Sequence, residues 1–330
     1  MQQGSNCGPA ARAAIVLAGG EGLRLRSLTR RITGQDLPKQ FCTVLGHESL
    51  LEQTLNRVSL GIEPDLTFVA VTRDHERFYA PILAGLPAQN AVVQPRNRGT
   101  APAILYSLLR LAETAPQARV AVFPCDHFVE NDQEFMRHVE IAFTTSALRP
   151  ELTVLLGITP EWPETAYGWI ELGTEICETP VFRVNHFWEK PVAEVAKALM
   201  HRGSLWNSFV MVGQLSTLLA LFLIGLPELY LVFKKVRHAI ETKTEQEAIE
   251  RLYLDLNSTD FSEKALATRL PINLAVLPVC GIGWSDLGEP TRVMDTIARL
   301  RIRPQWARCV TENKIAGANF IKGRLTSDLS

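Results

Sequence analysis

An apolar run that breaks into a glycine-rich turn is the feature that most constrains how this sequence can fold. Residues 13–18 read AAIVLA, and Gly19, Gly20 and Gly22 follow at once. This pattern predicts a buried parallel strand that ends in a sharp turn. Glycine allows the backbone to approach a ligand closely, and the N–H groups of such a turn can bind an anion. The stretch therefore predicts a polyphosphate site, although a simple tight connection would have the same pattern.

The residues around this turn indicate which class of phosphate-binding site it could form. Five positive side chains follow the glycines and would add charge to an anion site: Arg24, Arg26, Arg30, Arg31 and Lys39. A dinucleotide-binding fingerprint would need glycine where Leu25 stands, and no Gly-Lys-Ser/Thr opens a following helix as a Walker loop requires. The spacing therefore excludes both common phosphate loops and predicts a different nucleotide site.

Strands and helices alternate along most of the chain. Apolar runs predict strands at 66–72, 91–93, 119–123, 153–157, 181–188 and 276–279, and helical spacing predicts helices at 49–58, 74–86, 101–113, 192–202 and 213–240. Residues 206–208 are expected to form a turn into a strand at 209–212. The alternation predicts an α/β fold with a Rossmann-like, mostly parallel central sheet flanked by helices. In such sheets ligands bind at the carboxyl ends of the strands.

Composition and charge set limits on partners and organisation. The 330 residues suffice for one large domain, and the net charge of −1 argues against nucleic acid as the main partner. Six scattered cysteines favour free thiols in a reducing cytoplasm. We expect a flexible leader at 1–11, one domain at 12–300 and a short C-terminal extension at 301–330. The apolar stretch 215–233 is split by Pro227 and Glu228, which predicts a core helix and no membrane contact.

Two aspartates follow predicted strands or turns and could hold a cation. Asp126 lies within FPCDH, and Asp286 lies within WSDLG. Magnesium is usually held by one or two carboxylates together with substrate oxygens and water. A lone aspartate in such a place is more often a helix cap or a turn residue. The residues alone leave both interpretations open.

Seven motifs, in order, resemble those of the sugar-phosphate nucleotidyltransferases, the enzymes that make nucleoside-diphosphate sugars. They are GGxGxRL with PKQ (19–40), QPRNRGTAPA (94–103), FPCDH (123–127), YGWIE (167–171), FWEKP (187–191), WNS (206–208) and WSDLG (284–288). The motif at 94–103 resembles the segment that guanylyltransferases acting on mannose 1-phosphate use against the nucleotide. The resemblance implies a GT-A-like form of the α/β fold. It also implies transfer of a guanylyl group from GTP to mannose 1-phosphate with Mg²⁺.

Carried over to single positions, the resemblance implies a role for each of several residues. Phosphate groups would meet Arg24, Lys39 and Lys190, and the metal would meet Asp126 and Asp286. Nucleotide contacts would come from Leu17, Gly19, Gly20, Gly22, Gln94, Gly99 and Thr100, and sugar contacts from Gly168, Glu171 and Asn207. Lysine is a point charge suited to phosphate, and glutamate and asparagine offer acceptors and donors to a polyol. For Lys190 the alternative is an ordinary solvated lysine.

Four positions depart from the family pattern. Arg26 stands where an aromatic residue is frequent, Ser27 where proline is common, and Ala166 and Phe209 where glycine is expected. A phenylalanine in place of glycine beside the sugar pocket could narrow that pocket. These departures leave two alternatives open: another sugar 1-phosphate as substrate, or a non-catalytic relative that binds a nucleotide sugar. His127 is expected only to neighbour the metal site, and a homodimer is compatible with the sequence.

Overall fold

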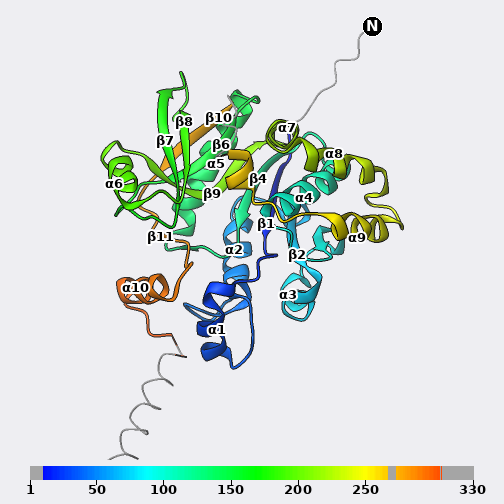
Figure 1. Cartoon of the computed structure of the whole chain (residues 1–330), viewed down its shortest axis with the longest axis horizontal. Helices are drawn as coiled ribbons and strands as arrows, with labels where there is room; N and C mark the ends of the chain where they lie inside the picture. Colours follow the sequence, from blue (N-terminus) through cyan, green and yellow to red (C-terminus); the bar gives the residue numbers. More distant parts are fainter. Residues whose placement is uncertain (1–9, 267–272, 305, 307–330) are drawn as a thin grey trace, which may run out of the picture.

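A nine-stranded sheet runs through the computed structural model, which describes residues 10–266, 273–304 and 306 (Figure 1). The strand order is β3-β2-β1-β4-β9-β6-β10-β8-β7. Strands β8 and β9 pair with their neighbours in antiparallel fashion, and the other strands share one direction. The predicted α/β fold with a mostly parallel sheet is therefore confirmed. The strands are β1 (Arg12–Leu17), β2 (Thr67–Thr72), β3 (Ala91–Gln94), β4 (Arg119–Pro124), β6 (Thr153–Ile158), β7 (Gly168–Glu175), β8 (Phe182–Glu189), β9 (Leu205–Gln214) and β10 (Leu274–Val279).

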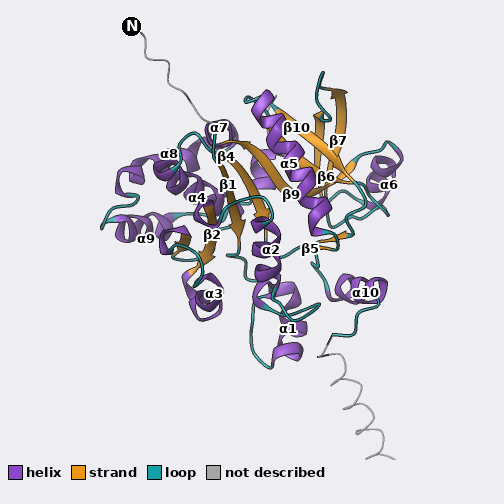
Figure 2. Cartoon of the chain, turned by 180° about the vertical axis from the view of Figure 1, so that it is seen from behind, coloured by secondary structure: helices purple, strands orange, loops and turns teal. Residues whose placement is uncertain are grey.

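Helices cover both faces of this sheet, as the two opposite views show (Figure 2). One face carries α2 (Leu50–Ser59), α3 (Glu76–Leu83), α5 (Asp132–Leu148) and α6 (Ala193–His201), and the other carries α4 (Thr100–Thr114), α7 (Leu215–Gly225), α8 (Pro227–Val236) and α9 (Glu245–Asp255). Strand β1 shows why both faces need cover. Its Ala14 and Val16 belong to the first core, and Ala13 and Ile15 belong to the second. Side chains alternate across a strand, so an all-apolar strand must be buried on both sides.

A smaller layer lies at one end of the sheet. Helix α1 (Arg26–Thr33) packs there with α10 (Pro290–Leu300) through Leu25, Leu28, Val293 and Ile297. Nearby, β5 (Phe128–Val129) pairs in antiparallel fashion with β11 (Trp284–Ser285). This short pairing joins the segment after β4 to the segment after β10. It therefore brings together two loops that are far apart in the sequence.

The expected turn at 206–208 is wrong, because these residues belong to the central strand β9. Between the pairs Leu155–Met211 and Gly157–Asn207 the register shifts, so that β9 bulges away from β6. The hydroxyl of Ser208 donates to the carbonyl oxygen of Leu156 at 2.6 Å and fills the gap in the ladder. The polar motif is thus a bulge within a strand.

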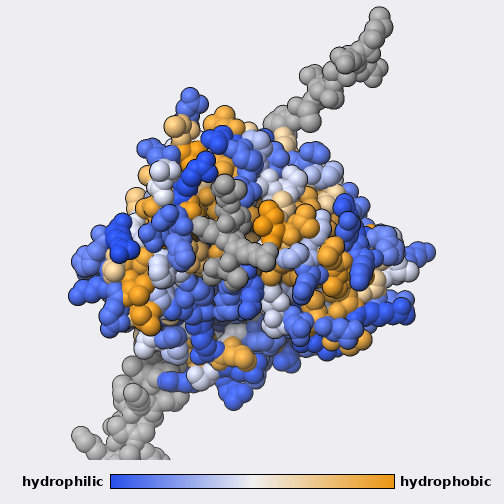
Figure 3. Space-filling model, turned by 45° about the horizontal axis from the view of Figure 1, so that its top comes forward, coloured by the Kyte–Doolittle hydropathy of each residue, from blue (hydrophilic) through white to orange (hydrophobic). Residues whose placement is uncertain are grey.

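The described surface carries several exposed apolar side chains. The face in Figure 3 carries hydrophilic and hydrophobic residues side by side. Large exposed apolar side chains include Leu223 and Ile224 of α7, Leu231 of α8 and Leu254 of α9. Exposed apolar residues are normal on folded proteins, so the homodimer stays a prediction. Within the described part of the chain, every helix is too short or too polar to cross a bilayer. The expected leader and C-terminal extension lie almost entirely outside the described residues.

An ion pair with a buried arginine links two of the four helices on the first face, and we expect its loss to be costly. Arg57 of α2 has 4% of its side chain exposed, and its Nε contacts the carboxylate of Asp132 at the start of α5. Asp132→Ala would leave the guanidinium without a counter-charge in a poorly solvated place. We expect a loss of about 2 to 3 kcal/mol in the free energy of unfolding, measured by urea denaturation.

A second substitution in the same helix controls for general effects. Glu134 pairs with Arg137 on the exposed side of α5, and exposed pairs contribute little. Glu134→Ala should leave the urea midpoint close to that of the parent. Equal midpoints for the Asp132→Ala and Glu134→Ala variants would contradict the importance of the buried pair.

Candidate active site

One cavity lies where the carboxyl ends of the parallel strands meet. The ends of β1 and β4 are adjacent because Leu17 pairs with Pro124, and Gln94 at the end of β3 pairs with Thr72. The cavity there has a volume of about 370 Å³. Ten of the predicted site residues line it: Leu17, Gly19, Gly20, Gln94, Gly99, Thr100, Asp126, Gly168, Asn207 and Asp286. Glu189, from the one motif that these ten leave out, lines the cavity too, so the structure gathers residues from all seven motifs around one space.

The carbonyl oxygens of the glycine turn accept hydrogen bonds from nearby side chains, whereas its amides are unpaired. Gln40 donates through Nε2 to the carbonyl oxygens of Ala18 and Gly20 at 3.0 and 2.7 Å, and Thr72 donates to that of Gly19 at 2.9 Å. Among the described residues, the amides of Gly19, Gly20 and Gly22 donate no hydrogen bond. A Cβ on Gly19 would lie 2.9 Å from Nε2 of Gln94 and 3.1 Å from Oγ1 of Thr72, so a larger residue would have to displace these side chains. Unpaired N–H groups in a glycine turn suit an anion.

The segment after β3 leads into α4, and the first residue of this helix lines the same cavity. Gly99 has φ +86°, and a Cβ there would lie 2.4 Å from the carbonyl oxygen of Thr259, so glycine is required. Thr100 begins α4, and its hydroxyl accepts from the amide of Phe261 at 2.8 Å. The amide oxygen of Gln94 accepts from the hydroxyl of Tyr253 at 3.1 Å. These contacts fix the loop against the segment around residue 260.

The carboxylate of Asp126 lies beside two positive or polar groups. Its Oδ2 lies 3.0 Å from Nζ of Lys39, and its Oδ1 lies 3.6 Å from Nε2 of His127. Burial alone would raise the pKa of Asp126, but the charge of Lys39 and the hydrogen bonds to the carboxylate outweigh it and hold the pKa below its ordinary value. Burial is also the main reason that the pKa of His127 is lowered. Asp126 is therefore ionised at neutral pH, next to an imidazole that is neutral.

Lys39 lies beneath the carboxylates and joins their two loops. Its Nζ donates to the carbonyl oxygen of Asp286 at 2.9 Å and to that of Leu287 at 3.3 Å, besides contacting Asp126. An ammonium group has three N–H donors, so all of them are in use. With 8% of its side chain exposed, Lys39 does not line the cavity. The resemblance implied contact with a phosphate group, whereas the structure places this lysine as the link between Asp126 and the backbone at Asp286.

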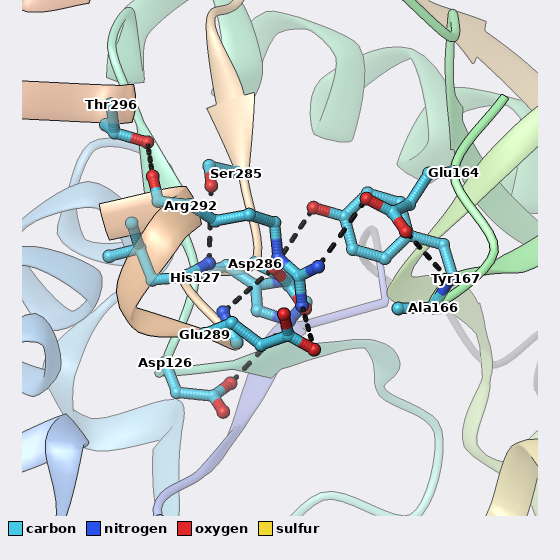
Figure 4. Close-up of polar contacts among 12 residues, drawn as sticks. Asp126, His127, Glu164, Ala166, Tyr167, Ser285, Asp286, Glu289, Arg292 and Thr296 are labelled. Carbon is cyan, nitrogen blue, oxygen red and sulfur yellow. Dashed lines mark hydrogen bonds and ion pairs between the residues drawn. The ribbon is translucent and has the colours of Figure 1, made fainter. Parts of the chain in front are cut away.

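Asp286 is held by a group of residues that includes an arginine (Figure 4). Its Oδ1 accepts from the hydroxyl of Tyr167 at 3.0 Å and from the amide of Gly288 at 2.9 Å. Arg292 of α10 places Nε 2.8 Å from Oδ1 and Nη2 3.4 Å from Oδ2. Burial and the negative charge of Asp286 together raise the pKa of Tyr167, which therefore stays neutral and donates its proton. Of the two carboxylate oxygens, Oδ2 keeps more free acceptor capacity.

The other end of the cavity differs from the sequence prediction at Glu171. This carboxylate accepts from Trp188 Nε1 at 3.2 Å and from Asn185 Nδ2 at 3.3 Å, and it does not line the cavity. Glu189, opposite Gly168 in the strand pairing, lines it instead. A Cβ on Gly168 would lie 2.9 Å from Cζ of Phe187 and 3.2 Å from Oε2 of Glu189, so the glycine leaves room for both side chains.

The remaining predicted phosphate residues lie outside the cavity wall. Lys190 is half exposed, and its Nζ lies 2.8 Å from Oε1 of Glu189. Its pKa is raised chiefly by the hydrogen bond to Glu189, and the charge of Arg24 acts in the opposite sense. Arg24 is exposed. Gly22 has φ +60° and packs against the backbone of Lys39.

Several residues in and around this site were missed by the sequence prediction. Within the motifs a signal was present, since Tyr167, Glu189 and Trp284 all belong to segments that carry the resemblance. Arg292 and Glu164 lie outside every motif, and their ion pair at 3.5 Å depends on the fold. Asp260 also lines the cavity, from a part of the chain in which the sequence predicted no element.

Comparison with known proteins is consistent with this site. A family model described as "Nucleotidyl transferase" matches residues 13–301. A protein of Sinorhizobium fredii named mannose-1-phosphate guanylyltransferase is 30% identical over 325 residues, which is 94% of this chain and 57% of that protein. The alginate biosynthesis protein AlgA of Pseudomonas fluorescens is 30% identical over 283 residues, 83% of this chain and 56% of that protein. The chain thus spans about half the length of these relatives.

Solved structures share the fold. A crystal structure from Thermus thermophilus, titled mannose-1-phosphate geranyltransferase, has a TM-score of 0.71 and 27% identity, covering 84% of this chain and 76% of that chain. A Helicobacter pylori structure titled mannose-6-phosphate isomerase has a TM-score of 0.63 at 20% identity, covering 83% and 99%, and it supports the fold alone.

The bulge of β9 holds a strained residue, which leads to a test of stability. Phe209 lines the cavity and has φ +64°, a conformation that costs most L-residues about 1 kcal/mol or more. Phe209→Ala keeps this strain, whereas Phe209→Gly relieves it. We therefore expect the glycine variant to be more stable than the alanine variant by about 1 kcal/mol in urea denaturation.

The neighbouring residue provides the control. Val210 lies in the same strand and is not among the residues with positive φ, and in a strand interior glycine is less stable than alanine by roughly 0.5 to 1 kcal/mol. The pair Val210→Ala and Val210→Gly should therefore show the opposite order. The same order at both positions would mean that the backbone at Phe209 is not strained in solution.

Proposed function

Because this chain belongs to the nucleotidyl transferase family, we propose that it transfers a guanylyl group from GTP to mannose 1-phosphate. The products would be GDP-mannose and pyrophosphate. The observation that carries the proposal is one cavity lined both by Gly19 and Gly20, whose amides are unpaired, and by Asp126 and Asp286. A triphosphate needs both features, since amides bind its oxygens and carboxylates recruit the cation that offsets its charge.

The reaction needs positioning more than it needs a base. An oxygen of the sugar phosphate would attack the α-phosphorus, the bond from that phosphorus to the bridging oxygen of the β-phosphate would break, and pyrophosphate would leave with the electron pair. A phosphate monoester has a second pKa of about 6, so the attacking group is already ionised at neutral pH. The glycine turn would hold the triphosphate in line, with Arg24 above it, while Gln94, Gly99 and Thr100 would contact the guanosine.

The two carboxylates fit a magnesium ion. Asp126 is ionised and lines the cavity, and Asp286 keeps acceptor capacity on Oδ2. Within the described ranges, no group of three or more acidic, histidine or cysteine side chains could hold a metal. Mg²⁺ typically takes one or two carboxylates and completes its shell with phosphate oxygens and water. When bound, the ion would neutralise charge on the phosphates.

The sugar would lie toward the strands β7, β8 and β9. Gly168 and Asn207 line this end, and Glu189 offers its carboxylate to sugar hydroxyls. Glu171 would first have to release Trp188, so Glu189 takes its place in the proposal. Lys190 would bind the sugar phosphate after leaving Glu189.

A specific observation favours a second candidate, a different sugar 1-phosphate. Phe209 and Ala166 both line the cavity at positions where the family resemblance predicts glycine. Their side chains reduce the space beside Asn207. A substrate panel distinguishes the two candidates, and the homodimer and the cytoplasmic location remain expectations from the sequence.

The test is pyrophosphate release by the purified chain with GTP, Mg²⁺ and mannose 1-phosphate. Glucose 1-phosphate and other nucleoside triphosphates form the panel. Asp126→Asn should lower kcat/KM at least about 100-fold, because the metal loses a charged ligand. Asp65→Asn, an exposed residue that does not line the cavity, should leave kcat/KM unchanged.

The possible outcomes separate the candidates. Release with another sugar phosphate alone would support the second candidate. Binding of GTP without release for any pair would show a non-catalytic relative and overturn the proposal. Thermal melting of Asp126→Asn is needed beside the kinetics, since Lys39 loses its counter-charge in that variant.

A further inference from the structure

Arg292 occupies a place in the site that no motif assigns. It reaches from α10 to Asp286 with 11% of its side chain exposed (Figure 4). Its guanidinium faces both oxygens of Asp286, lies 3.5 Å from Oε2 of Glu164 and sits 5.2 Å from the centre of the Tyr167 ring. Its side chain is thus held on several sides. It is a fixed positive charge next to a carboxylate proposed to hold the metal.

Neighbouring donors already use much of the hydrogen-bond acceptor capacity of the Asp286 carboxylate. Tyr167 and Gly288 donate to Oδ1, and Nε of Arg292 lies 2.8 Å from the same oxygen. Only Oδ2, with Nη2 of Arg292 at 3.4 Å, keeps acceptor capacity. A divalent cation at that oxygen would meet both a competing donor and a like charge. At such distances the repulsion is substantial even with protein screening.

The other carboxylate is balanced in the same way. Asp126 has Lys39 at 3.0 Å, so each of the two aspartates has its own cation in the free protein. Lys39 and Arg292 differ in the other contacts that they make. Lys39 is tied to two backbone carbonyl oxygens and holds the loops together. Arg292 contacts the carboxylates of Asp286, Glu164 and Glu289, so its main effect is on charge.

We propose that Arg292 weakens the binding of a divalent cation to Asp286 in the free protein, so that tight metal binding requires the phosphates of the nucleotide. Arg292 is a positioning residue in this role, because it acts through Asp286. The inference rests on the proposed function, since that function supplies the metal. It goes further by naming the residue that sets the order in which metal and nucleotide bind tightly.

The test measures binding of Mn²⁺ to the full chain without nucleotide, by the loss of the free-ion signal in electron paramagnetic resonance. Arg292→Met removes the charge, and we expect Mn²⁺ to bind at least about tenfold more tightly. Asp286→Asn added to this variant should abolish the gain. A merely structural role for Arg292 would predict unchanged or weaker binding.

Matched variants control for the loss of an arginine elsewhere on α10 and for unfolding of the Arg292 variant. Arg299 lies on the same helix, 3.9 Å from Glu161 and away from the cavity lining, and Arg299→Met should leave Mn²⁺ affinity unchanged. Should Arg292→Met unfold, Arg292→Gln keeps a donor without the charge and Arg292→Lys keeps the charge. We then expect Arg292→Gln to bind Mn²⁺ more tightly and Arg292→Lys to behave like the parent.

Two results would overturn the inference. One is Mn²⁺ affinity that is unchanged or lower in both neutral variants. The other is a gain that survives Asp286→Asn, because the ion would then bind elsewhere. Neither result depends on turnover, so failure of the inference and failure of the proposed transferase activity can be told apart. If the parent chain released no pyrophosphate but the variants showed the expected Mn²⁺ affinities, only the proposed transferase activity would be overturned.

Discussion

The buried ammonium group of Lys39 is the contact on which the site depends. It joins the carboxylate of Asp126, after β4, to the backbone at Asp286 and Leu287, after β11. The short pairing of β5 with β11 brings these segments near each other, and Lys39 then fixes their separation. A buried lysine is costly unless it is fully paired. Here each N–H has an acceptor, so the cost is offset and the geometry becomes specific.

The sequence predicted the fold well because the fold rests on local patterns. Strand β1 is apolar at nearly every position and alternates between two cores, which only a sheet covered on both faces allows. Because the carboxyl ends of parallel strands meet at the same edge of a sheet, Gly19, Gln94 and Asp126 were expected to lie at that edge. These predictions needed only residue type and chain order. The exception within the sheet, the bulge of β9, arises from register with β6, which a single strand does not encode.

Side-chain direction was much harder to predict. Lys39 and Glu171 both have the residue type expected for a ligand contact, yet one is buried under the carboxylates and the other is held by Trp188. Glu189 reaches the cavity because Gly168 opposite it leaves room. Which of two carboxylates on neighbouring strands faces a ligand depends on pairing register. Arg292 reaches the site from a helix whose position depends on contacts with α1, so no local pattern marks it.

Charge balance explains how such a site can exist without its ligands. Asp126 and Asp286 are both partly withdrawn from water, and isolated carboxylates there would destabilise the fold. Lys39 lies beside Asp126 and Arg292 lies beside Asp286, so each carboxylate has a cation next to it. A metal ion accompanied by a triphosphate arrives with a net negative charge, and so it can bind there without adding positive charge beside Arg292. A metal ion alone cannot, because Arg292 remains beside it. The same pairing that stabilises the site in the free protein therefore favours the joint arrival of cation and nucleotide.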